Sequence, residues 1–236
     1  MSDNTADFLA LTRAPVGVRE LVADTLRQAI IRGDLLPGER LMEADLAKRM
    51  GVSRPSLREA LSQLAAEKLI TIVPNRGPSV ASINWKEAQE IYQVRSLMEG
   101  EVAHLFALKA TRPQLDSMHA ALARFKQAMD PCDTLGLVSS TAEFYAVMFE
   151  GCGNGIITEL LAGLNARIGI LRARSMSRPG RAVHSLAEMG AILACLEKGD
   201  AKGARAAVEA HVEAAAAAAR ESFNQLKKQE AASKAR

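Results

Sequence analysis

Apolar positions recur at three- and four-residue steps along most of the chain, which is the spacing of one face of an α-helix. In the N-terminal part this pattern predicts a helix from about Val18 that ends at Gly33, and a second helix over about residues 43–50. Gly51 is the expected end of the second helix, because a left-handed cap costs glycine little. Ser53 then caps a third helix, since a serine oxygen can accept from the first free backbone N–H groups.

The period of the pattern changes after Lys68. Residues 69–73 form a short β-branched run, residues 74–77 contain Pro, Asn and Gly, and residues 78–81 lead back along the chain. This arrangement predicts a two-stranded hairpin. Three helices followed by a hairpin, with a four-residue turn between the second and third helices, are typical of a winged helix-turn-helix.

From residue 84 onward the pattern predicts only helices. They are expected over about 85–110, 113–130, 137–150 and 155–174, then in a helix that ends near 198 and a last helix that begins at Asp200. The predicted fold class is mainly α, with an N-terminal winged helix-turn-helix and a C-terminal all-helical bundle. We expect a flexible N-terminal arm over 1–14, the winged helix-turn-helix over 15–82, the helical domain over 85–222 and a charged tail over 223–236.

Composition fits a globular protein with two domains: 236 residues, 48% of them hydrophobic and 24% charged. No apolar run approaches 18 residues, and the first residues lack the basic and apolar regions of a signal peptide. Three cysteines without a CxxC spacing are expected to be small buried hydrophobes. We therefore expect a cytoplasmic protein with no membrane partner.

Charge is locally concentrated, although the whole chain carries only +3. Between Lys48 and Arg76 there are six basic residues and two acidic ones, and such a patch is what contact with phosphates needs. Arg54 and Arg58 are four residues apart, so they share a face at the start of the third helix, the part that faces base edges in the major groove. The candidate DNA-binding residues, including two at the tip of the hairpin, are Ser53, Arg54, Ser56, Arg58, Arg76 and Gly77.

The sequence also resembles a known family. Residues 35–41 (LLPGERL), 51–61 (GVSRPSLREAL) and the hairpin residues up to 80 look like the N-terminal domain of GntR-type regulators. Residues 92–100 (YQVRSLMEG), 178–181 and 199–200 resemble, more loosely, the all-helical ligand-binding FCD domain of the FadR-like subgroup. The resemblance implies a homodimeric transcriptional regulator, expected to be a repressor, that binds a palindromic double-stranded DNA operator and responds to a small-molecule effector.

Many members of this subgroup hold a metal ion through one aspartate and three histidines. The matching positions here are Thr141, Tyr145, Met189 and His211, so one of the four ligands remains. Divalent transition metals prefer imidazole and carboxylate donors over a hydroxyl, a neutral phenol or a thioether. We therefore expect no tightly bound metal and no cofactor.

Arg95 lies at the Val-Arg-x-Leu-x-Glu position of the family, and a guanidinium can bind a carboxylate through two hydrogen bonds. This predicts a small anionic effector such as an organic acid, although Arg95 could instead pair with Glu99 four residues on. The candidate ligand-binding residues are Arg95, Thr141, Tyr145, Met189 and His211.

Two other functions are compatible with the pattern. One is an architectural dimer that binds DNA without an effector, because a fold does not fix a function. The other is a helical enzyme with an accessory winged domain. The helical part contains one Glu-x-x-His, from Glu101 to His104, whereas a di-iron bundle needs two such pairs and further glutamates. We therefore do not expect an enzyme.

Overall fold

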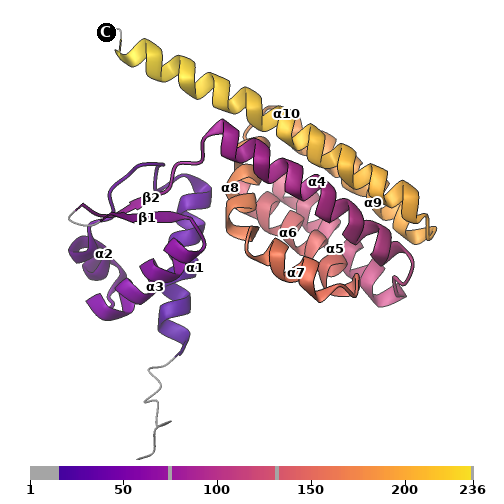
Figure 1. Cartoon of the computed structure of the whole chain (residues 1–236), viewed down its shortest axis with the longest axis horizontal. Helices are drawn as coiled ribbons and strands as arrows, with labels where there is room; N and C mark the ends of the chain where they lie inside the picture. Colours follow the sequence, from indigo (N-terminus) through magenta and orange to yellow (C-terminus); the bar gives the residue numbers. More distant parts are fainter. Residues whose placement is uncertain (1–15, 74–75, 131–132, 235–236) are drawn as a thin grey trace, which may run out of the picture.

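A computed structural model describes residues 16–73, 76–130 and 133–234. The expected arm over 1–14, and the expected turn residues Pro74 and Asn75, lie outside the described residues. The described chain forms two units, a small one with three helices and a hairpin and a larger helical one (Figure 1). A short link before Trp85 joins the two units.

The N-terminal unit has the predicted winged helix-turn-helix order. Its elements are α1 (Val16–Arg32), α2 (Glu43–Met50), α3 (Arg54–Ala66), β1 (Ile70–Val73) and β2 (Gly77–Val80). Gly51 ends α2 in the left-handed conformation, with φ of 66°, and Ser53 caps α3, as predicted. Ile70 lies opposite Val80 in the antiparallel hairpin, and the two side chains join the buried leucines of α3 in one core.

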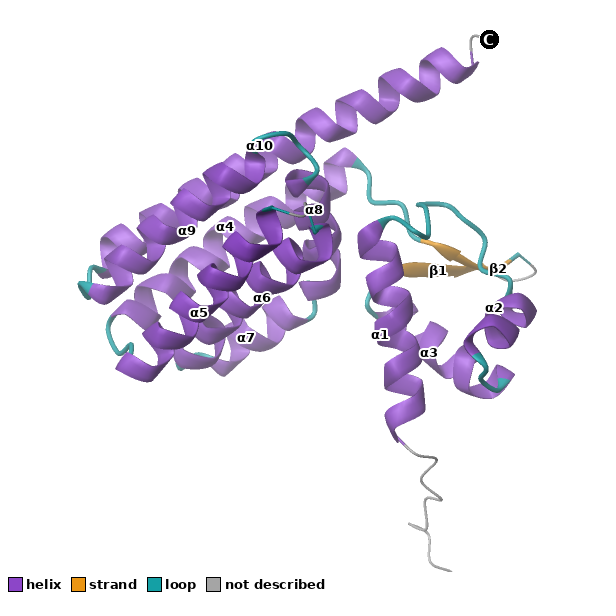
Figure 2. Ribbon diagram, turned by 180° about the vertical axis from the view of Figure 1, so that it is seen from behind, coloured by secondary structure: helices purple, strands orange, loops and turns teal. Residues whose placement is uncertain are grey.

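The helical unit is built around α4, whose N-terminus is capped by the Asn84 side chain. The last helix, α10, runs alongside α4 and also packs against α9 and α8 (Figure 2). α5 and α6 complete the bundle on the other side of α4 and α9. The bounds are α4 (Trp85–Ala107), α5 (Arg112–Met129), α6 (Thr134–Gly151), α7 (Gly155–Ala162), α8 (Asn165–Met176), α9 (Arg181–Glu197) and α10 (Ala201–Lys234).

One predicted helix is wrong, and the last helix runs further than expected. The expected single helix from 155 to about 174 is broken into α7 and α8 at Gly163, a residue that stabilises a helix poorly, and Leu164 then packs against the core. α10 continues past the expected start of a charged tail at residue 223. Phe223 is buried there, with its ring centroid 5.6 Å from that of Trp85, so apolar packing holds this turn of the helix in place.

The two units meet where α1 packs against α8 and α6. Gly169 of α8 faces Ile31 of α1 so closely that an added Cβ would lie 3.3 Å from the Ile31 Cδ1. The interface therefore depends on a helix surface without a side chain at that point. None of the helices in the described part of the chain is long and apolar enough to cross a membrane.

Candidate functional site

The start of α3 is fixed by two serines. The Ser56 backbone N–H donates to Ser53 Oγ at 3.3 Å, and the two hydroxyl oxygens lie 2.8 Å apart. Ser53 therefore satisfies a free N–H group at the helix end, and both side chains are used in shaping that end. Their expected role of positioning the helix agrees with these contacts.

Arg54 and Arg58 are both exposed on α3. Arg54 occupies the first position of the helix. Arg58 Nε donates to Glu43 Oε2 on α2 at 2.7 Å, while its side chain stays 67% exposed. The contact orients the guanidinium through Nε, so the two terminal nitrogens are available to bases or phosphates.

The tip of the hairpin carries the other two candidate DNA contacts. Arg76 is exposed, and its backbone N–H donates to the Val73 oxygen at 3.0 Å. Gly77 follows with φ of 75°, a left-handed conformation that favours glycine. Arg76 is thus presented on the solvent side of a tight turn.

The helical unit contains a second group of arginines, which is buried. Arg95 of α4 donates to Glu99 through Nε at 2.8 Å and Nη2 at 3.3 Å, and both residues are at most 1% exposed. Burial opposes the charge of Arg95, but the carboxylate of Glu99 more than compensates and raises the pKa of Arg95. The i, i+4 pair foreseen from the sequence is therefore present.

A second, partly buried ion pair lies within α9 and contacts His211 of α10. Both terminal nitrogens of Arg181 donate to the Glu188 carboxylate, at 2.9 and 2.7 Å, and His211 Nδ1 lies 2.7 Å from Glu188 Oε2. Burial and the nearby Arg95 lower the pKa of His211, despite its contact with Glu188. Burial opposes the charge of Glu188, but the hydrogen bonds from His211 and Arg181 and the charge of Arg181 outweigh it and lower the pKa of Glu188.

Tyr145 and Arg172 complete the buried polar cluster. The Arg172 guanidinium carbon lies 5.1 Å from the centre of the Tyr145 ring, and the ring centroid of His211 is 6.0 Å from that of Tyr145. Burial and the neighbouring charge of Arg95 lower the pKa of Arg172 to about 10. Burial also raises the pKa of the Tyr145 hydroxyl, so this phenol stays neutral and can donate a hydrogen bond.

Several polar atoms of this cluster are buried and make no hydrogen bond within the described residues. Leaving a buried donor unpaired costs roughly 1–3 kcal/mol, so a concentration of such atoms in one place needs an explanation. The atoms are Tyr92 Oη, Arg95 Nη1, Tyr145 Oη, Arg172 Nε and Nη2, and Arg181 Nε.

The structure brings together three of the five predicted ligand-binding residues: Arg95, Tyr145 and His211. Thr141 and Met189 are also fully buried, on α6 and α9. However, the Thr141 hydroxyl donates to the Leu137 carbonyl at 2.7 Å, so its proton is already used.

The donors at the four family metal positions do not fit a divalent ion. Thr141 is committed to a backbone carbonyl and Tyr145 is held neutral, which leaves a thioether and one imidazole. Within the described residues, no group of three or more His, Cys, Asp or Glu side chains could hold a metal.

Three charged members of the cluster are not among the residues predicted from the sequence: Arg172, Arg181 and Glu188. A signal was present for Arg172, because it lies three residues after Gly169 and four after Ile168, in the buried stripe of α8 that continues to Ser175. A charged residue at such a position marks either a buried ion pair or a ligand site. Arg181 and Glu188 are seven residues apart, two turns of helix, so their pairing can also be recognised from spacing.

Comparison with known proteins identifies both units. The model of bacterial regulatory proteins of the gntR family matches residues 19–80, and the FCD domain model matches residues 90–214. The HTH-type transcriptional regulator YdhC of Bacillus subtilis is 27% identical over 187 residues, 79% of this chain and 84% of that protein. The transcriptional repressor GlaR of Escherichia coli is 30% identical over 140 residues, 57% of this chain and 63% of that protein.

Among solved structures, McbR/YncC of Escherichia coli has the same fold, with a TM-score of 0.78 at 21% sequence identity over 88% of this chain and 99% of that one. The fold, the order of the two domains and the family models agree. The chain belongs to the GntR family of DNA-binding transcriptional regulators and carries an FCD domain.

Proposed function

We propose that this regulator is a metabolite-responsive repressor that binds a palindromic operator as a homodimer in the cytoplasm. The observation that carries the proposal is the coexistence of an exposed arginine surface on α3 with a buried, incompletely satisfied polar cluster in the helical domain. The first suits phosphates and base edges, and the second suits a small polar ligand. GlaR, a relative, is named a repressor, which supports the sign of regulation.

The DNA contacts are assigned to the serines and arginines at the start of α3 and to the hairpin tip. Arg54 and Arg58 read bases or bind phosphates in the major groove, while Ser53 and Ser56 hold the helix end in place. Arg76 and Gly77 enter the neighbouring minor groove.

The effector is assigned to the buried polar cluster and is an organic acid. Arg95 Nη1, Arg172 and the Tyr145 hydroxyl are donors without a partner, and hydrogen-bond donors that include two guanidinium groups favour a carboxylate. His211 adds a polar contact, while Met189 and the ring of Tyr145 supply apolar walls. Thr141 lines the site without donating, since its proton is used within α6.

This assignment is tested by adding small mono- and dicarboxylic acids to the protein–operator complex. Gel shift measures which acids release the operator. Arg95→Met combined with Glu99→Leu removes the ion pair without leaving either charge buried alone. We expect this double variant to bind the operator as the wild type does and to lose release by the active acid. A double variant that responds fully, or an effector that proves cationic, would show that the assignment is wrong.

The homodimer follows from the geometry of DNA. One recognition helix reads only a few base pairs, and a two-fold protein matches a two-fold operator. The helical domain, with the first helix α4, is the expected site of dimer contacts. Sedimentation in the presence of operator tests this, and a monomer at micromolar concentration would contradict it.

A regulator without an effector is the competing function. The Arg95–Glu99 pair and the Arg181–Glu188–His211 group favour it, because self-contained ion pairs also occur in polar cores that bind nothing. Thermal unfolding with the same acids separates the two functions, since a ligand of the native state raises the apparent stability.

A further inference from the structure

A cleft of about 630 Å³ separates the DNA-binding domain from the helical domain. One wall is formed by α1 and the end of α3, and the other by α6, α8 and the turn between α7 and α8. Both domains thus contribute to one cavity, and its volume lies in the range of small-molecule sites. Apolar residues on both walls include Ile31, Ala66, Leu135, Val138 and Ala166.

Arg172 of α8 contributes to this cleft, and its guanidinium is incompletely paired among the described residues. It is 4% exposed, and its Nε and Nη2 atoms make no hydrogen bond within the described residues. The ring of Tyr145 lies 5.1 Å from its guanidinium carbon, but an aromatic face is a weak substitute for a counter-charge. A buried cation in this state favours an anion from outside the protein.

The nearby carboxylates are each bound to another cation. Glu99 receives two hydrogen bonds from Arg95, and Glu188 is held by Arg181 and His211.

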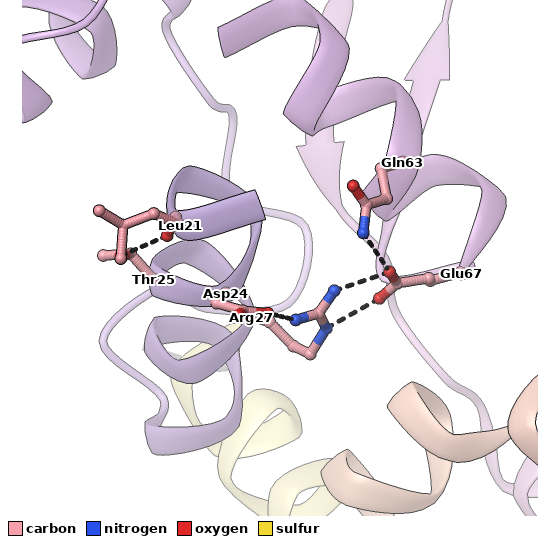
Figure 3. Close-up of polar contacts among 6 residues, drawn as sticks. All are labelled: Leu21, Asp24, Thr25, Arg27, Gln63 and Glu67. Atoms are coloured by element: carbon pink, nitrogen blue, oxygen red, sulfur yellow. Dashed lines mark hydrogen bonds and ion pairs between the residues drawn. The ribbon is translucent and has the colours of Figure 1, made fainter. Parts of the chain in front are cut away.

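On the opposite wall, Glu67 lies between Arg27 and Gln63, as Figure 3 shows. Arg27 Nε and Nη2 donate to Glu67 at 2.8 and 2.7 Å, and Arg27 also contacts Asp24. Arg172 is therefore the cation of this cleft that lacks a protein carboxylate among the described residues.

We propose that this interdomain cleft is a binding site for an organic anion with an apolar body, with the anionic group on Arg172 and the body between Ala66 and Val138. The proposal shares Arg172 with the effector assignment above, but it concerns a different cavity, whose walls come from both domains. A ligand held there contacts the DNA-binding domain directly, so its binding is coupled to the position of that domain.

Octanoate is a suitable probe, with octanamide as the uncharged control, and binding is measured by titration calorimetry on the full chain. Two variants change the cleft from opposite walls. Arg172→Met removes a cation that has no described partner, so the change leaves no charge unpaired. Ala66→Phe fills the cleft from the end of α3, and Ser62→Phe, one turn earlier on an exposed position outside the cleft, is its matched control.

We expect the wild type and Ser62→Phe to bind octanoate, and both cleft variants to bind it at least tenfold more weakly. The amide should bind at least tenfold more weakly than the acid. If Arg172→Met fails to fold, Ala66→Phe still decides the question.

Octanoate binding that survives in Ala66→Phe but is lost in Arg172→Met would place the anion inside the helical domain and overturn the cleft site, leaving the proposed effector site intact. Equal binding of acid and amide, or no binding of the acid by a wild type that still binds its operator, would also overturn the cleft site alone.

Discussion

The two domains use arginine in opposite ways. On α3 of the DNA-binding domain, Arg54 and Arg58 are exposed, and Arg58 is 67% accessible even in its contact with Glu43. In the helical domain, Arg95 and Arg172 are 1% and 4% exposed. Exposed cations lower the free energy of unfolding little and remain free to bind a polyanion. Buried cations must be paired with an anion of the protein or of a ligand.

The difference in exposure between the two sets of arginines also means that the two domains suit different kinds of ligand. The exposed arginines of α3 attract phosphates electrostatically, and added salt weakens this attraction. At 0.1 M salt, exposed charges are screened from one another beyond about 10 Å. The buried cluster is shielded from such screening, so it discriminates by hydrogen-bond geometry and by shape. One domain is thus suited to a long charged surface and the other to a single small molecule.

The largest effect is expected from breaking the buried pair. Arg95→Ala leaves Glu99 charged and buried, which should lower the free energy of unfolding by about 3–5 kcal/mol. Arg112→Ala is the matched control, because Arg112 pairs with Asp116 at the same i, i+4 spacing but with a side chain that is 76% exposed. Its expected cost is about 0.3–0.5 kcal/mol. Urea unfolding measures both, and equal losses would show that burial does not distinguish the two pairs.

The exposed arginines are expected to affect DNA binding instead of stability. Arg54→Ala and Arg58→Ala should each weaken operator binding by about 1–3 kcal/mol if the side chain reads a base, with little change in unfolding. If the contact is to a phosphate, all sequences weaken alike and the salt dependence becomes shallower. Fluorescence anisotropy at several salt concentrations distinguishes the two. Unchanged operator affinity in the double alanine variant would remove both residues from the interface.

Features that depend on local sequence could be predicted. Gly51 ends a helix and Ser53 begins the next one, because each acts on backbone groups a few residues away. The hairpin was predicted for the same reason, since a change of period and a turn are local signals. The DNA-binding candidates all belong to these local features, and their placement on the surface follows from them.

Features that depend on tertiary contacts could not be predicted in the same way. The extension of α10 through Phe223 is decided by packing against Trp85, a residue distant in sequence. The buried cluster combines side chains of α4, α6, α8, α9 and α10. Spacing along α4 and α9 can indicate the pairs within each helix, but it cannot show that these pairs meet Tyr145 and Arg172. The family resemblance supplied Arg95 and His211, while Arg172 needed the structure.

A smaller effect is expected from the buried histidine. Burial lowers the pKa of His211 below its ordinary value of 6.5, so the unfolded chain binds this proton more readily than the folded one. Stability should therefore fall as the pH drops below 6.5, with a slope from this group of at most about 1.4 kcal/mol per pH unit. The Glu188 carboxyl, whose pKa is also lowered, adds its own loss only below its ordinary value of 4.5.

Urea unfolding between neutral pH and about pH 5.5 measures this slope, and His211→Gln should flatten it. His119→Gln is the control, because His119 lies the same 2.7 Å from a glutamate, Glu197, but its side chain is 51% exposed. A similar flattening in the control variant would show that burial is not the cause.

The smallest expected effect is that of metal. In the buried cluster both glutamates are already paired with arginines, and Arg181 occupies both oxygens of the carboxylate that His211 contacts. A divalent ion would have to displace this arginine and to accept Met189 or a neutral Tyr145 as a ligand, which such ions bind poorly. We therefore expect that a chelator such as EDTA leaves the Tm unchanged, that added zinc does not raise it, and that elemental analysis of protein purified without chelator finds no stoichiometric metal. A bound zinc or nickel ion that disappears in His211→Gln would contradict this and would mean that the cluster rearranges to complete a metal shell.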